Sequence, residues 1–198
     1  MDYPSNYFTA AITRFEMKKE KYYRQTFDYW MDWMTKPEDQ RSPMERIGCF
    51  VNIYSLFEYR LKSLVIEDSY ENQVPIIKKD QKKRGNLGKD DYRGITPKEY
   101  KEYKGGDLHI LGATTMKTIQ NTMKFGSIFS NQNFNFIVQI IDFRNSILHQ
   151  TMFRHKEITD EKIEELIKGF RIVDARLKSL RRSWKRMKKI KTDKPIPL

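Results

Sequence analysis

The sequence has little cysteine, with Cys49 as its one thiol. One cysteine excludes an intramolecular disulfide and a metal site built from several thiolates, so we expect a reducing, cytoplasmic location. The sequence also lacks any run of about 18 uncharged apolar residues, so no membrane-spanning helix is expected. The opening residues, MDYPSNYF, lack the basic and apolar regions of a secretion signal, and we expect none.

Several motifs of well-known enzyme classes are also missing. The chain has no glycine-rich phosphate loop, no serine-hydrolase elbow and no paired-carboxylate motif. His109 and His155 have no cysteine or acidic residue at metal-ligand spacing, and we expect both to face solvent. The sequence therefore predicts no metal, no cofactor and no nucleotide-dependent reaction.

Positive charge, in contrast, is abundant. Lys and Arg number 38 against 26 Asp and Glu, which gives a formal net charge of +12. A field of this sign attracts polyanions such as RNA and speeds their encounter with the protein. The alternative is a lysine-rich surface that serves only solubility, and charge by itself does not decide between the two.

Hydrophobic residues repeat at helical spacing, with no sustained alternation typical of strands. The second helical segment has the clearest start, because Ser42, Pro43 and Glu45 form the pattern of a capping box with proline at the first helical position. We predict one all-α domain over 1–198, an antiparallel bundle of about five helices whose last helix is long and basic. The expected helices cover approximately residues 6–35, 43–64, 107–123, 133–151 and 159–187.

Residues 67–106 interrupt the helical pattern. This stretch contains five glycines, and from position 78 to 104 it has ten Lys and Arg against five Asp and Glu. We expect a basic surface loop with a short helix near Pro97–Tyr103, either as a mobile insertion or as an element that grips RNA. Residues 188–198 are expected to form a flexible basic tail.

The last predicted helix combines an apolar seam with basic outer faces. Its apolar residues, from Ile163 to Met187, are spaced alternately by three and four, which is typical of core packing and also of a coiled coil. The basic faces are candidates for contact with an RNA backbone, and a solubilising surface is the alternative. The RNA-binding candidates are Arg181, Arg182, Lys185, Lys188 and Lys189.

The candidate catalytic site lies on the predicted helix at 133–151. Arg144 falls in the middle of the apolar arc of this helix, where a guanidinium is costly unless it is paired or reaches a wet cleft. Asn145 and His149 lie at one edge of the arc, four residues apart, so that their side chains can touch. Asp142 lies beside them. The alternative is structural: Arg144 would pair with Glu58 or Asp142, and His149 would be an ordinary boundary histidine.

These residue types suit cleavage of a phosphodiester bond without a metal. Histidine exchanges protons near neutral pH, the arginine fork binds phosphate oxygens, and asparagine can orient the imidazole. Arg144 and His149 are about 140° apart around their helix, so they converge poorly on one phosphate within a single subunit. A two-fold axis beside this helix would bring two copies of each residue together.

The segment Arg144–His149, RNSILH, resembles the signature of the HEPN superfamily, in which an arginine and a polar residue precede a histidine after four to six intervening positions. Phe143 and the Ile147–Leu148 pair also fit this signature. The segment YSLFEYRL at 54–61 resembles the family's early core helix, which makes Glu58 an auxiliary candidate. The resemblance covers roughly residues 42–180, and the 67–106 insertion and the basic C-terminal extension fall outside the shared core.

The resemblance implies a metal-independent endoribonuclease that acts as a homodimer and leaves a 2′,3′-cyclic phosphate and a 5′-hydroxyl. It assigns catalysis to Arg144, Asn145 and His149, with Glu58 and Asp142 as auxiliary residues. Family members serve as toxins, abortive-infection factors and CRISPR effectors, so we expect a role in antiviral defence and an antitoxin or regulatory protein as a possible partner. The alternatives are a non-catalytic HEPN-like RNA-binding or scaffolding protein and a helical protein-interaction module.

Overall fold

A computed structural model gives the fold and describes residues 21–72, 76–77, 92–105, 116–148 and 155–192. Apart from one short antiparallel pair, these residues form helices and turns, which confirms the predicted all-α class. Residues 21–34 are helical and are called the N-terminal helix below. The other elements are η1 (Glu38–Gln40), α2 (Pro43–Glu71), β1 (Ile76–Ile77), β2 (Tyr92–Arg93), α3 (Pro97–Gly105), α5 (Met116–Phe125), α6 (Asn131–Leu148), η4 (His155–Glu157) and α8 (Asp160–Thr192).

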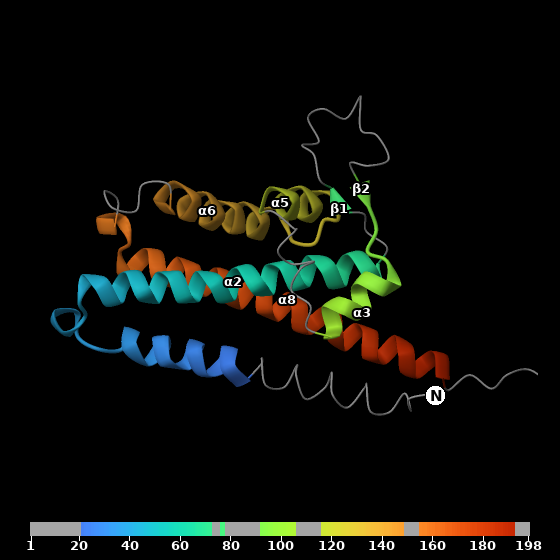
Figure 1. The fold of residues 1–198 in the computed structure, drawn as a ribbon, viewed down its shortest axis with the longest axis horizontal. Helices are drawn as coiled ribbons and strands as arrows, with labels where there is room; N and C mark the ends of the chain where they lie inside the picture. Colours follow the sequence, from blue (N-terminus) through green and yellow to red (C-terminus); the bar gives the residue numbers. More distant parts are fainter. Residues whose placement is uncertain (1–20, 73–75, 78–91, 106–115, 149–154, 193–198) are drawn as a thin grey trace, which may run out of the picture.

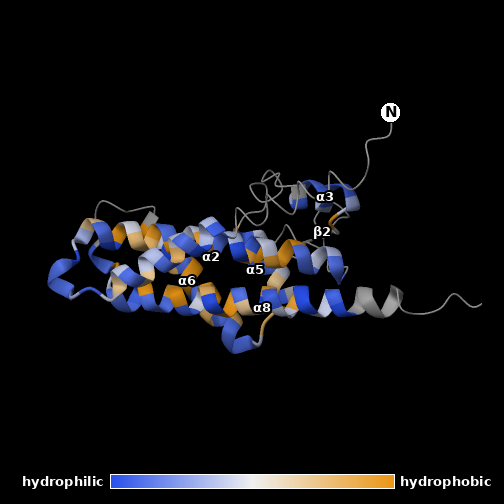
Figure 2. Ribbon diagram, turned by 90° about the horizontal axis from the view of Figure 1, so that it is seen from below, coloured by the Kyte–Doolittle hydropathy of each residue, from blue (hydrophilic) through white to orange (hydrophobic). Residues whose placement is uncertain are grey.

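The two longest helices, α2 and α8, form the centre of the bundle (Figure 1). The N-terminal helix lies on one side of this pair, and α5 and α6 lie on the other (Figure 1). Hydrophobic residues recur between hydrophilic ones along α6 and α8, as expected for amphipathic helices (Figure 2). One continuous hydrophobic core joins these helices, and it includes Phe57, Leu61, Ile141, Leu166 and Leu177.

A glycine lets α6 approach α8 closely. Gly169 is buried on α8, and a side chain added there would collide with Ile140 of α6 and contact Phe57 of α2. The absence of a Cβ at this position therefore sets how near α6 lies to the central pair.

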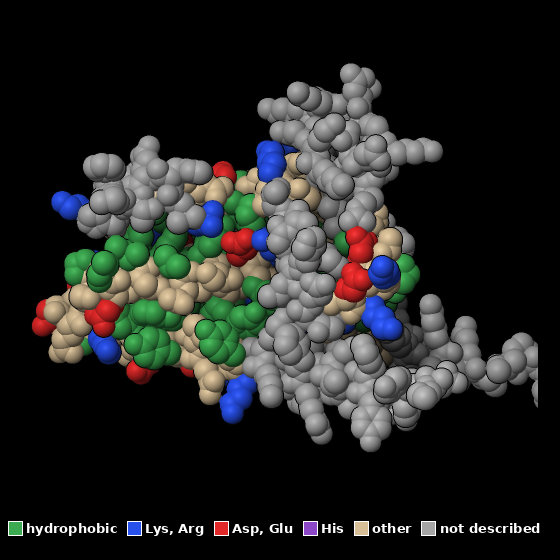
Figure 3. All heavy atoms as spheres, viewed as in Figure 1, with side chains coloured by type: hydrophobic (Ala, Val, Ile, Leu, Met, Phe, Trp, Pro, Cys, Tyr) green, Lys and Arg blue, Asp and Glu red, His purple; other side chains and the backbone are tan. Residues whose placement is uncertain are grey.

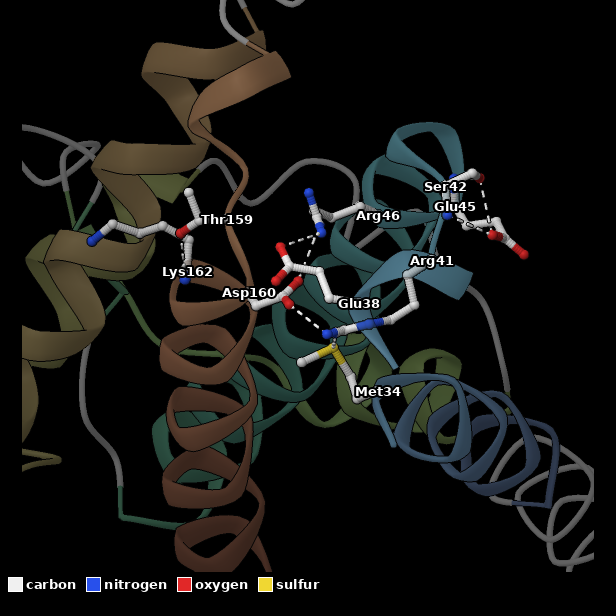
Figure 4. Close-up of polar contacts among 9 residues, drawn as sticks. All are labelled: Met34, Glu38, Arg41, Ser42, Glu45, Arg46, Thr159, Asp160 and Lys162. Atoms are coloured by element: carbon white, nitrogen blue, oxygen red, sulfur yellow. Dashed lines mark hydrogen bonds and ion pairs between the residues drawn. The ribbon is translucent and has the colours of Figure 1, made fainter. Parts of the chain in front are cut away.

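The start of α2 follows the predicted capping box. The Ser42 hydroxyl accepts a hydrogen bond from the Glu45 amide at 3.2 Å, and the Ser42 amide donates to the Glu45 carboxylate at 3.0 Å (Figure 4). The bond from the Ser42 backbone lowers the pKa of Glu45, because it stabilises the ionised carboxylate. Pro43 occupies the first helical position, where its missing N–H costs nothing.

A cluster of ion pairs joins the start of α2 to the first turn of α8 (Figure 4). Asp160 binds Arg41 at 2.7 Å and Arg46 at 3.0 Å, and Arg46 also lies 3.5 Å from Glu38. The Arg41 guanidinium also lies over the Trp33 ring, 5.4 Å from its centroid. The carboxylate of Asp160 is favourably placed at the positive end of the α8 dipole. These contacts fix the end of the bundle opposite to the insertion.

The predicted break at residue 67 was wrong, because α2 continues to Glu71. The residues from Ile66 to Ser69 are all buried, and tertiary packing therefore extends the helix past the point where its apolar repeat ends. The predicted short helix near Pro97 is confirmed as α3. Its Tyr100 ring stacks on Tyr70 of α2 with ring centroids 3.9 Å apart. The predicted helix start at residue 107 lies outside the described residues, as do the ends of the chain at 1–20 and 193–198.

The same described ranges bear on membrane and metal binding. No helix there is both long enough and apolar enough to cross a bilayer. No group of three or more His, Cys, Asp or Glu side chains in those ranges is arranged to hold a metal ion. Cys49 is buried, and burial raises the pKa of its thiol to about 12, so the thiol stays protonated and inert.

Candidate functional site

Arg144 lies on α6 in a half-buried position facing α2. Its guanidinium carbon is 5.0 Å from the centroid of the Tyr54 ring, within cation–π distance. Its Nη1 donates a hydrogen bond to Oδ1 of Asn145 at 3.2 Å. No carboxylate of the described residues forms an ion pair with Arg144, so the structural alternative of pairing with Glu58 or Asp142 is not observed there.

Aromatic packing holds this part of α6 against α2. Phe143 meets Phe50 edge to face, with ring centroids 5.7 Å apart and an interplanar angle of 86°. Ile141 and Ile147, on either side of Arg144, are fully buried in the main core. The guanidinium therefore emerges at the edge of a rigid α2–α6 contact, and its position is set by buried neighbours.

Tyr54 is the site residue that sequence reasoning missed. Its ring belongs to the hydrophobic core, with 3% of the residue's surface exposed. Its hydroxyl, however, has no hydrogen-bond partner among the described residues. A buried donor in this state calls for an explanation. The available signal was a tyrosine in an otherwise aliphatic and phenylalanine stripe, one helical turn before Glu58.

The electrostatics around Tyr54 place several predicted residues near one another. Burial raises the pKa of the Tyr54 hydroxyl, and the positive charge of Arg144 opposes that rise. The negative charges of Glu58 and Asp142 raise the pKa further. All three charged groups therefore act on the same buried hydroxyl, although they come from two helices.

The two auxiliary candidates differ in their surroundings. Glu58 is half-buried and forms an ion pair with Lys62 on its own helix, with Nζ and Oε1 2.7 Å apart. Asp142 is exposed, and it has no ion pair with a described side chain. Glu58 is therefore neutralised locally, whereas Asp142 remains available to water or to a partner.

The second catalytic candidate, His149, lies outside the described residues, directly after the last described residue of α6. Its geometry relative to Arg144 therefore stays a prediction. Asn145 was predicted to orient this imidazole. In the structure its side-chain oxygen instead accepts a hydrogen bond from Arg144, so the described role of Asn145 is to fix the guanidinium.

Among the basic candidates on α8, Arg181 is held inside the fold. Its Nε and Nη2 donate to the two carboxylate oxygens of Glu67 at 2.9 and 2.6 Å. The RNA contact predicted for Arg181 therefore competes with a bidentate ion pair. Arg182 and Lys185 are exposed and keep that role as a prediction. The side chains of Lys188 and Lys189 lie outside the described ones.

Glu67 is the centre of a buried polar cluster that also includes α3. Only 3% of its surface is exposed, and it accepts further bonds from Tyr103 at 2.9 Å and from Lys104 at 3.3 Å. Burial alone would raise the pKa of Glu67, but the bonds and charge of Arg181, with help from Lys104 and Tyr103, outweigh burial and lower it. The carboxylate is therefore ionised, and it ties α3 to both α2 and α8.

Comparisons of the chain with protein-family models, with curated proteins and with solved structures yield no match. Function is therefore inferred from the chemistry of the described residues and from the resemblance of the Arg144–His149 segment to the HEPN signature.

Proposed function

We propose that the protein is a metal-independent endoribonuclease of the HEPN type, with Arg144, Asn145 and His149 in its active site. The observation that supports this most is the state of Arg144. Its guanidinium is half-buried, rests on the Tyr54 ring and is not neutralised by a described carboxylate. A guanidinium held in this way presents its remaining N–H donors in a fixed plane, which suits the oxygens of a phosphate.

The proposed reaction is an attack of a ribose 2′-oxygen on the adjacent phosphorus. His149 takes the proton of the 2′-hydroxyl or delivers one to the leaving 5′-oxygen as the P–O5′ bond breaks. Arg144 stabilises the negative charge that develops on the non-bridging phosphate oxygens. Asn145 and the Tyr54 ring hold the guanidinium in place, so little freedom is lost when the phosphate binds. The products would be a 2′,3′-cyclic phosphate and a 5′-hydroxyl.

The proposal includes a homodimer, because helical spacing in the sequence predicts Arg144 and His149 to lie about 140° apart around their axis. A second copy placed across a two-fold axis would supply the complementary histidine and arginine to each phosphate. By resemblance, the setting would be antiviral defence in the cytoplasm, with RNA as substrate and with an antitoxin or regulatory protein as a possible partner.

The direct test is cleavage of a fluorescent single-stranded RNA in the presence of EDTA, followed on denaturing gels. We expect His149→Ala and Arg144→Ala each to lower the rate by about a hundredfold or more, since each removes a group that acts in the transition state. Lys124→Ala, which removes an exposed cation on α5 outside the basic face of α8, is the control and should keep most of the activity. Full cleavage by either site variant would exclude this assignment.

The exposed basic face of α8 favours a second candidate, an RNA-binding protein without catalysis. The exposed cationic residues in the described part of α8 are Lys168, Arg171, Arg176, Lys178, Arg182, Lys185 and Arg186. This candidate predicts RNA binding that weakens steeply with salt, yields no cleavage product and is unchanged by His149→Ala. Absence of RNA affinity at moderate salt would instead favour a protein-interaction module.

A further inference from the structure

A groove with a volume of about 560 Å³ lies between the N-terminal helix and α8. Its floor includes Arg60 of α2, which is six residues after Tyr54 and therefore about 240° further around that helix. The groove thus lies on a different face of α2 from Arg144. Its size falls within the range of roughly 300–1,000 Å³ that small-molecule sites occupy.

The charges that line this groove are unbalanced. Five cations face two carboxylates, and one of these carboxylates, Asp174, is already neutralised. Its two oxygens lie 3.4 Å from Arg60 Nε and 2.6 Å from Lys178 Nζ. The three remaining cations are exposed and have no ion pair with a described carboxylate: Lys21, Arg24 and Arg171.

Arg60 and Asp174 form a rigid base for the groove. Arg60 is 7% exposed, and its guanidinium lies 6.0 Å from the centroid of the Tyr23 ring. Because Arg60 and Asp174 are paired with each other, the excess positive charge comes from the exposed rim. A ligand with negative charge would therefore place that charge at the rim and its less polar part inside.

Aromatic rings provide the inner walls. Phe27 of the N-terminal helix stacks on Phe170 of α8, with centroids 4.7 Å apart, and Tyr23 packs on Tyr59 at 4.6 Å. Tyr23, Phe27 and Phe170 all line the groove and are only partly buried. Partly buried rings beside cations are the arrangement with which proteins bind nucleobases next to phosphates.

We propose that this groove binds a ligand that carries a planar ring and a phosphate group. The ring lies against the aromatic walls, and the phosphate is bound by Arg24 and Arg171 at the rim. The exposed carboxylate of Asp28 is placed to accept a hydrogen bond from a sugar hydroxyl. Two sources offer this chemistry, a free nucleotide and the phosphorylated end of an RNA strand. This role goes beyond the proposed ribonuclease activity and does not depend on it.

The test is isothermal titration of the full-length chain, in EDTA, with AMP, adenosine and inorganic phosphate. We expect AMP to bind at least about tenfold more tightly than either fragment, because only AMP uses both the rings and the rim. The double variant Arg24→Ala with Arg171→Ala should lower AMP affinity at least about tenfold, since it removes two charge-assisted contacts. The control removes two exposed cations that neither line the groove nor belong to the candidate RNA-binding residues, Lys36 and Lys124.

A short 2′-O-methylated RNA, tested with and without a 5′-phosphate, distinguishes the two sources of the ligand. The proposed nuclease cannot cleave this RNA. Binding that requires the 5′-phosphate and exceeds that of AMP identifies an RNA end, and tighter binding of AMP identifies a free nucleotide. Equal affinity for AMP and inorganic phosphate would overturn the proposal, because the rings would play no part. Absence of binding by every probe, or unchanged affinity in the double variant, would overturn it as well.

Discussion

Two arginines on neighbouring helices, Arg181 and Arg144, sit in opposite surroundings. The guanidinium of Arg181 donates two hydrogen bonds to a buried carboxylate, and its side chain is 33% exposed. The guanidinium of Arg144 is also partly exposed, but it rests on a ring and an amide oxygen, with no described carboxylate. The first fork holds the fold together, whereas the second, with no carboxylate among the described residues, fits the anion-binding role proposed for it.

The residues around each arginine repeat this contrast. Around Glu67, donors from α3 and α8 satisfy one carboxylate completely. Near Arg144, the buried hydroxyl of Tyr54 has no described hydrogen-bond partner.

Hydrophobic side chains are exposed on the face formed by the N-terminal helix and the start of α2 (Figure 3). The exposed large hydrophobic residues in the described part of the chain are Tyr22, Tyr29, Met44 and Val51.

Removing the buried carboxylate should have the largest effect on stability. We expect Glu67→Ala to lower the free energy of unfolding by roughly 2–4 kcal/mol, because three donors lose their shared acceptor and two of them remain partly buried. Arg144→Met should lower the free energy of unfolding by less than about 1 kcal/mol, since no described carboxylate loses its partner. Urea unfolding of both variants measures the difference. Equal losses of unfolding free energy in the two variants would show that the surroundings of Arg181 and Arg144 do not differ in their contribution to stability.

The same contrast should appear in the dependence of stability on pH. The pKa of Glu67 is lowered in the folded state, so its contribution is fully present above its unfolded pKa of about 4.5. That contribution is lost as the pH falls through the lower folded pKa. We therefore expect Glu67→Gln to be less stable than the parent chain by roughly 1–2 kcal/mol at pH 7. The difference in unfolding free energy between the parent chain and the variant should become smaller below about pH 4.5. A difference independent of pH would show that the charge of Glu67 does not stabilise the fold.

The smallest effect is expected at Tyr54. Tyr54→Phe keeps the ring that supports Arg144 and removes a buried hydroxyl with no described partner, so the free energy of unfolding should change by less than about 1 kcal/mol. Thermal unfolding would measure this change. A loss of unfolding free energy well above 1 kcal/mol would mean that the hydroxyl forms a strong hydrogen bond. The polar groups near Arg144 would then have partners, as those around Glu67 do.

Local sequence signals predicted the parts of the fold that depend on local physics. The capping box at Ser42 satisfies backbone groups within a few residues, so its pattern is visible in the chain itself. The end of α2 was mispredicted, because the burial of Glu67 and Asp68 depends on α3 and α8. Polar residues that end an apolar repeat look like a helix terminus until their partners are known.

For the candidate site, helical periodicity is enough to identify the unusual residues: an arginine within an apolar arc, with an asparagine beside it. It did not determine that Arg144 rests on Tyr54, or that Arg181 is bound by Glu67 across 114 positions of the chain. The packing of the helices sets which of the two guanidinium groups pairs with a described carboxylate. The physical reason is that helical periodicity assigns a side chain to a face, whereas its charge partner comes from whichever distant element packs on that face.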